Sequence, residues 1–136
     1  MPLHLLKLAV GIEDIDHLRR VRAARWAERG SHWVLTRNHP RRAQDVLAGG
    51  SIYWVIRGQI RVRQRITGFR RNRDDNGRRY CLIELDERLV PTLLRPWRPF
   101  QGWRYLAPED APSDCSEPRD PSFDLLLARL RSLGLI

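Results

Sequence analysis

Lysine is almost absent from this chain of 136 residues, although the chain is strongly basic. Lys7 is the only lysine, so arginine supplies nearly all of the positive charge behind the formal net charge of +9 at pH 7. Cysteine is also scarce, and Cys81 and Cys115 form no CxxC pair. The four histidines are scattered, so no Cys/His cluster has the spacing of a metal site. We therefore expect no metal and no cofactor, and two free thiols in a cytoplasmic protein.

Long hydrophobic runs and the common catalytic motifs are missing as well. No apolar stretch approaches the roughly 20 residues that a membrane-spanning helix needs. Residues 1–10 are too short for a signal peptide and have no charged lead of the usual kind. We expect no membrane partner. Gly-x-Ser-x-Gly, phosphate-loop and His-Glu-x-x-His motifs do not occur, so the motifs give nucleophilic catalysis little support.

The chain does have a positive charge that is concentrated in its middle. Residues 17–73 hold fifteen arginines against two acidic residues, a net charge of +13, whereas residues 74–105 sum to +1 and residues 106–136 to −3. A GC-rich genome explains arginine in place of lysine, but it does not explain where the charge lies. A basic middle beside a mildly acidic tail indicates a surface that binds a polyanion. Nucleic acid is the first expectation, and an anionic membrane surface or an acidic protein are the alternatives.

Hydrophobic periodicity predicts an α+β domain over residues 1–112 with a small, curved, mostly antiparallel sheet or β-barrel. About three helices are expected, at residues 13–29, 40–48 and 121–133. Residues 113–136 are predicted to form a polar linker and a C-terminal helix that packs on the domain or on a partner. A dimer through that helix is one expectation, and the sequence leaves the oligomeric state open.

The strand pattern is interrupted by two turn signals. Asp74-Asp75-Asn76-Gly77 is a strong hairpin signal, so strands 59–70 and 79–86 should pair antiparallel around it. A further short strand is expected at residues 90–95. Gly58 separates two other strands, and we expect a bulge or a sharp bend there rather than a hairpin turn.

The most informative stretch runs from Gly49 to Ile66. Alternate residues of a strand share a face, so Ile60, Val62, Gln64 and Ile66 should line one face and a basic row the other. The predicted row consists of Arg57, Gln59, Arg61, Arg63 and Arg65. Like charges in a row repel one another unless something negative lies along them. The row therefore predicts contact with phosphates, and a solvated face partly paired to Glu84 and Asp86 is the alternative.

Aromatic residues near these arginines suggest stacking on exposed bases. Trp97 lies in a proline-spaced loop and is the first stacking candidate, Trp103 is the second, and core packing is the alternative for both. No recognition-helix motif favours the reading of a duplex, so RNA or single strands, including modified bases, are the expected partners. The expected nucleic-acid-binding residues are Arg37, Arg41, Arg42, Arg57, Arg61, Arg63, Arg65, Trp97, Trp103 and Arg104.

Catalysis has weaker support than binding. An enzyme acting on RNA or a modified nucleobase, as a hydrolase would, has only Glu84, Ser51 and Tyr53 as candidate residues. Gly49-Gly50 before Ser51 is more simply a helix stop that leads into a strand. A third possibility is a protein-interaction module that uses the last helix or the proline-rich loop.

Several segments together resemble an uncharacterised alphaproteobacterial family, domain of unknown function 1489. They are residues 3–8, Thr36-Arg37 with Pro40-Arg41-Arg42, the block 49–65, and residues 98–106. The resemblance covers nearly the whole chain up to about Pro112. The family has no established activity, so the resemblance implies a compartment and a lineage rather than a mechanism.

More distantly, the chain resembles the PUA-like superfamily and its ASCH domains, small β-barrels that bind RNA or modified nucleobases. The ASCH signature is Gly-x-Lys-x-x-Glu-x-Arg, and Gly50 and Arg57 fall at its first and last positions. Ile52 and Val55 replace its Lys and Glu, which are implicated in the chemistry of hydrolytic members. The resemblance therefore implies a fold and a binding cleft without the charged pair.

Overall fold

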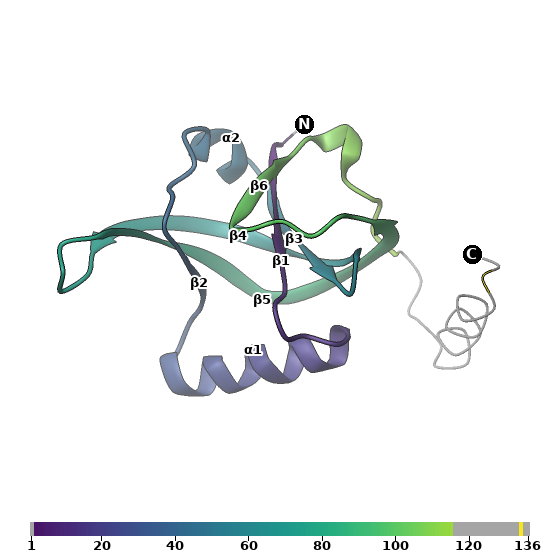
Figure 1. Ribbon diagram of the computed structural model, residues 1–136, viewed down its shortest axis with the longest axis horizontal. Coiled ribbons are helices and arrows are strands. Elements are labelled where there is room, and N and C mark those ends of the chain that lie inside the picture. Colours follow the sequence, from purple (N-terminus) through teal and green to yellow (C-terminus); the bar gives the residue numbers. More distant parts are fainter. Residues whose placement is uncertain (1, 116–133, 135–136) are drawn as a thin grey trace.

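The computed structural model describes residues 2–115 and residue 134, and within them it contains one six-stranded sheet and two α-helices (Figure 1). The elements are β1 (His4–Leu8), α1 (Ile15–Arg29), β2 (His32–Thr36), α2 (Ala43–Leu47), β3 (Ser51–Ile56), β4 (Gln59–Arg73), β5 (Arg79–Pro96), β6 (Trp103–Leu106) and the 3₁₀-helix η1 (Pro108–Asp110).

The sheet is mixed and open. Its strand order is β2-β5-β4-β3-β1-β6, so β2 and β6 are its edges. Only β1 and β3 run parallel to each other, and every other neighbouring pair is antiparallel. The expected small α+β fold with a mostly antiparallel sheet is therefore confirmed. The alternative of a closed barrel is not confirmed, because the described edge strands β2 and β6 do not pair with each other.

Helix α1 begins two residues later than predicted, because Asp14 caps it from outside. The Asp14 side chain accepts a hydrogen bond from the backbone N–H of His17, which satisfies a donor of the first turn. Gly30 ends the helix in the left-handed conformation, with φ of 70°.

The second helix is shorter than predicted. Helix α2 covers Ala43–Leu47 where residues 40–48 were predicted. The helix predicted at residues 121–133 lies outside the described residues. Neither described helix has the length and apolar character that crossing a bilayer requires.

Alternate residues of β3 point to two apolar clusters, one on each face of the sheet. The main core contains Ile52, Trp54 and Ile56 from β3, and helices α1 and α2 cover it through Leu18 and Val46. The second core contains Tyr53 and Val55 from β3, with residues of the chain beyond β5 packed against it. Strand β3 is therefore buried along its whole length.

Arg57 and Gly58 form a tight hairpin turn, which corrects the expectation of a bulge or bend at Gly58. Both residues have positive φ, 50° and 77° respectively, and Ile56 pairs with Gln59. This is the geometry of a two-residue type I′ turn.

A bulge does occur at Arg61, and it divides the predicted row of arginines. Trp54 pairs with Val62 whereas Val55 pairs with Ile60, so Arg61 is the extra residue. Ile60 accordingly packs in the second core and Val62 in the main core. The prediction of one uninterrupted basic face is therefore wrong, because the bulge reverses the alternation.

Strand β5 runs unbroken over Arg79–Pro96, where two separate strands were predicted. Residues 113–115 lie beside its second half. The backbone N–H of Leu93 donates to the carbonyl of Ser113, and that of Cys115 donates to the carbonyl of Pro91. The beginning of the expected linker is thus hydrogen-bonded to the sheet.

The hairpin of β4 and β5 extends beyond the neighbouring strands (Figure 1). Strand β3 pairs with β4 only as far as Arg65, and β2 pairs with β5 only from Cys81 onward. The ribbon of residues 70–80 therefore has no adjacent strand on either side within the described part of the chain. The predicted turn at residues 74–77 is confirmed, and the Asp74 carboxylate accepts two backbone hydrogen bonds within it.

Candidate functional site

The segment between β2 and α2 connects the two edges of the sheet. Trp103 on β6 donates from Nε1 to the carbonyl oxygen of Asn38 over 3.0 Å. The backbone N–H of Arg42 donates to the hydroxyl oxygen of Tyr105 over 3.1 Å. Because β2 and β6 stand at opposite ends of the strand order, these contacts require a strongly curved sheet.

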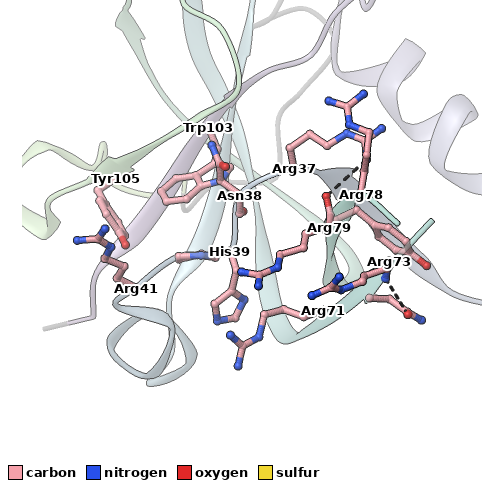
Figure 2. A pocket seen from close by; sticks show the side chains of 13 residues that line it. Arg37, Asn38, His39, Arg41, Arg71, Arg73, Arg78, Arg79, Trp103 and Tyr105 are labelled. Atoms are coloured by element: carbon pink, nitrogen blue, oxygen red, sulfur yellow. Dashed lines mark hydrogen bonds between the residues drawn. The ribbon is translucent and has the colours of Figure 1, made fainter. Parts of the chain in front are cut away.

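This arrangement surrounds a groove of about 1390 Å³, which we call the basic groove (Figure 2). Among the residues that the structure describes, six arginines line it and no carboxylate does. They are Arg37, Arg41, Arg71, Arg73, Arg78 and Arg79. The volume exceeds the roughly 300–1000 Å³ of a small-molecule pocket, so an extended anionic ligand suits the groove better than a compact one.

Four of these arginines come from the tip of the β4–β5 hairpin. Arg73 lies directly opposite Arg79, and Arg71 lies directly opposite Cys81. Arg71, Arg73 and Arg79 therefore share one face of the ribbon. Figure 2 shows the side chains of Arg71 and Arg79 extending towards His39. Like charges directly opposite each other destabilise a two-stranded ribbon, so the tip is electrostatically strained without an anion.

Arg37 is the one groove arginine with an ion pair among the described residues. Its guanidinium donates to the Asp74 carboxylate over 3.3 Å and to the carbonyl oxygen of Arg79 over 3.5 Å. Hydrogen bonds from the backbone of Arg78 and then from Arg37 lower the pKa of Asp74. Arg37 thereby ties the segment after β2 to the hairpin turn.

His39 also lines the groove, and it contacts Cys81. Its Nδ1 lies 3.7 Å from the Cys81 sulfur, and its ring meets Phe69 edge-on. Burial and then the charge of Arg71 lower the pKa of His39, which favours the neutral imidazole. Burial raises the pKa of Cys81, which keeps the thiol protonated. The pair offers polar contacts, not a thiolate nucleophile.

Two aromatic rings stand beside the arginines. Trp103 is half-buried against the main core, and its ring meets Tyr105 edge-on at 4.9 Å between centroids. Tyr105 is 38% exposed and lines the groove with Trp103. Trp97 does not line the groove. It packs against the second core, and the guanidinium carbon of Arg95 lies 5.6 Å from its ring.

Three of the ten expected binding residues, Arg37, Arg41 and Trp103, come together in the basic groove. Arg42 adjoins them but pairs with Asp45 over 2.9 Å. Arg104 donates to backbone carbonyls of its own loop, as alternation on β6 turns it away from Trp103 and Tyr105.

Arg63, at the centre of the expected row, is held by an acidic residue beyond β6. It donates two hydrogen bonds of 2.7 Å each to the Asp114 carboxylate and one of 3.0 Å to the Ser51 hydroxyl. The Arg63 hydrogen bond lowers the pKa of Asp114. The acid that pairs with Arg63 is thus Asp114, whereas Glu84 and Asp86 were the expected partners of the row.

The remaining members of the row also lie outside the groove. Arg57, at the hairpin turn, is 3.9 Å from the Glu13 carboxylate. Arg61, at the bulge, donates to the carbonyl oxygen of Ile56. Arg65 is exposed.

The three catalytic candidates are not gathered at one place. Ser51 and Tyr53 are buried on β3 next to Arg63, and burial raises the pKa of the Tyr53 hydroxyl. Glu84 lies on β5, with β4 between it and β3, and it pairs with Arg70 over 3.1 Å. This placement does not pair a nucleophile with a base.

His39 and the four arginines at the hairpin tip were not among the residues predicted from the sequence. A signal for the arginines was available, because they flank the turn at residues 74–77 that the sequence itself predicts. A hairpin places the residues before and after its turn side by side. A turn flanked by arginine on both strands therefore indicates a local concentration of charge.

The fold and the groove together define a small α+β protein with an arginine-lined surface. The family described as "Protein of unknown function (DUF1489)" matches residues 5–136, and the chain belongs to this family. The predicted family membership is thus confirmed. No curated protein matches the chain, and no solved structure matches it either.

Proposed function

We propose that the protein binds RNA or other single-stranded nucleic acid in the basic groove. The observation that carries the proposal is the direct opposition of Arg73 and Arg79 in a groove whose described lining has six arginines and no carboxylate. Such a surface repels itself when it is empty, and a run of phosphates relieves the repulsion. Nucleic acid supplies phosphates at regular spacing over the length of the groove.

Unpaired bases fit the groove better than a duplex. Trp103 and Tyr105 bring aromatic rings beside the arginines, and stacking on such rings contributes about 1–3 kcal/mol per base. A duplex hides the faces of its bases, whereas a single strand or an RNA loop exposes them. Modified bases keep their stacking faces and are included in the proposal.

The exposed members of the expected row contribute positive charge outside the groove. Arg57 and Arg65 are exposed, and they add to the long-range attraction of a polyanion. Arg63 is engaged by Asp114, so a phosphate there would have to displace a carboxylate.

The proposal extends to lineage and compartment. We take the protein to be a cytoplasmic, alphaproteobacterial relative of PUA-like and ASCH domains, with an open sheet in place of their barrel. Gly50 and Arg57, which stand immediately before and after β3, support the likeness. Ile52 and Val55 are fully buried where the signature has Lys and Glu, which favours binding over hydrolysis.

The test is the affinity for a labelled single-stranded RNA of about 20 nucleotides at two salt concentrations, followed by fluorescence anisotropy. Four phosphate contacts predict a loss of about 50-fold between 50 and 200 mM salt. The double variant R73A/R79A should bind about tenfold more weakly or worse, with a shallower salt dependence.

The matched control is R57A/R65A, which removes the same charge outside the groove and should bind nearly as well as the wild type. Unchanged binding by R73A/R79A would contradict the proposal. An equal loss in both double variants would mean that net charge alone attracts RNA, and it would exclude the groove as the site.

A further inference from the structure

A second, smaller cavity of about 300 Å³ lies where α1, β2 and β5 meet. Helix α1 contributes Arg19, Arg22 and Trp26 to its lining, β2 contributes His32, and β5 contributes Glu87 and an apolar residue. The cavity shares no lining residue with the basic groove. Its volume is at the small end of the range for ligand pockets, roughly 300–1000 Å³.

Arg22 is buried beside this second cavity, and no described carboxylate pairs with it. Its exposed fraction is 6%, and its Nε has no hydrogen-bond partner. Its guanidinium donates a long hydrogen bond of 3.4 Å to the carbonyl oxygen of Trp33 and lies 5.8 Å from the centre of the Trp54 ring. Burial, with the charges of Arg25 and Arg29, lowers its pKa to about 10, so it remains a cation at neutral pH. A buried charge without a counter-ion is strongly unfavourable.

His32 presents a second unsatisfied group at the same cavity. Its Nδ1 is buried without a partner, and its ring stacks on Trp26 at 4.9 Å between centroids. Among the described residues, Arg22 and His32 hold the only buried side-chain nitrogen or oxygen atoms that lack a hydrogen bond. Nearly all buried polar groups in proteins are satisfied. Two exceptions at one cavity indicate a ligand that bonds to both.

We propose that this cavity binds a small organic oxyanion, a carboxylate or a phosphate monoester. The anionic oxygens would accept hydrogen bonds from Arg22 and from Nδ1 of His32, since a guanidinium binds an oxyanion through two parallel N–H donors. Arg19, whose partner is the exposed Asp16 at 3.5 Å, would add a second guanidinium by exchanging that carboxylate for the ligand. The flat face of Trp26, which is 46% exposed, would cover an apolar body of the ligand. Glu87, the one carboxylate in the lining, is exposed, so solvent screens its charge.

The test uses the whole protein with sodium benzoate, phenyl phosphate or inorganic phosphate, each compared with sodium chloride at the same ionic strength. Both organic oxyanions should raise the Tm saturably beyond chloride, and they should shift the indole N–H signal of Trp26 in NMR spectra. The Trp26→Phe variant assigns that signal. The relative strength of the three ligands tells whether the site prefers carboxylate or phosphate and how much the apolar body contributes.

Arg22→Met should abolish both responses and should raise the Tm in chloride alone, because it removes an unpaired buried charge. Arg20→Met is the matched control, since Arg20 is an exposed arginine of the same helix that does not line the cavity. R73A/R79A should keep the Trp26 response, so a failure of this site can be told apart from a failure of the RNA groove.

No saturable response beyond chloride in the wild type would overturn the proposal, as would a full response in Arg22→Met. If Arg22→Met does not fold, Arg22→Lys keeps the charge but loses the paired donors. Its apparent affinity should then fall at least several-fold, and an unchanged affinity would overturn the proposal.

Discussion

Arg73 and Arg79 lie directly opposite each other across the hairpin of β4 and β5. Neither has an ion pair among the described residues, and both line the basic groove. Like charges in this position usually reduce the stability of a ribbon. The protein thus keeps a locally unfavourable pair where the proposed ligand would bind, as expected when function and stability compete.

Replacing Arg79 with Glu should therefore stabilise the protein and weaken its binding to RNA. An opposite-charge pair with Arg73 should add about 0.2–1 kcal/mol to the free energy of unfolding, measured with urea. Affinity for single-stranded RNA should fall by about tenfold or more. Arg65→Glu makes the same charge change on β4 outside the groove, and its affinity should fall much less. Unchanged affinity in Arg79→Glu would place the RNA site elsewhere.

The pair between Arg63 and Asp114 predicts a pH-dependent contribution to stability. Asp114→Asn should lower the free energy of unfolding at pH 7 by about 0.5–1 kcal/mol, since the pair is bidentate but partly exposed. The pKa of Asp114 is lowered in the folded protein, so this contribution is present above roughly pH 4 and is lost as the pH falls through the folded-state pKa.

Urea unfolding at pH 7 and pH 3 tests this prediction. The difference between the wild type and Asp114→Asn should shrink at pH 3. Asp75→Asn, at an exposed acid of the hairpin turn, should show little difference at pH 7. A difference for Asp114→Asn that is equal at both pH values would assign its effect to something other than the ion pair.

Gly50 should tolerate no side chain. A Cβ atom there would lie 2.2 Å from the carbonyl oxygen of Leu3 and 2.5 Å from that of Val46, both backbone atoms. Gly50→Ala should lower the free energy of unfolding by about 2 kcal/mol or more. In Gly68→Ala the nearest atom to the new Cβ would be a carboxylate oxygen of the flexible Glu84 side chain, at 3.0 Å. Thermal unfolding should show a large loss for the first variant and a small one for the second.

Tyr105→Phe should loosen the connection between the sheet edges. It removes the acceptor of the Arg42 backbone N–H, a hydrogen bond that contributes about 1 kcal/mol. Amide hydrogen exchange should become faster at Arg42, with little change in the central strands. Tyr80→Phe alters another tyrosine of the groove and should leave Arg42 unaffected. Unchanged exchange at Arg42 in Tyr105→Phe would show that the side-chain contact does not hold the segment.

Features that depend on neighbouring residues could be predicted from the sequence. The turn at residues 74–77 and helix α1 follow from turn and cap residues that lie next to one another. The prediction of a continuous basic row was wrong at Arg61. A bulge arises from the pairing of two strands, so it cannot be recognised from the sequence of one strand alone. The groove was found only in part, since it forms where β6 meets the segment after β2. Those hydrogen bonds join residues more than sixty positions apart, and the hydrophobic periodicity of a segment carries no information about such distant partners.

The ribbon of residues 70–80 has a consequence for how the groove works. Two-stranded ribbons without neighbours are marginally stable in water, so this tip should open locally at a free energy well below that of global unfolding. The wall with the most charge is then also the part of the sheet that opens most easily. A ligand bridging Arg73 and Arg79 to the opposite wall would order the tip as it binds. Affinity would in that case depend on the stability of the hairpin as well as on its charge.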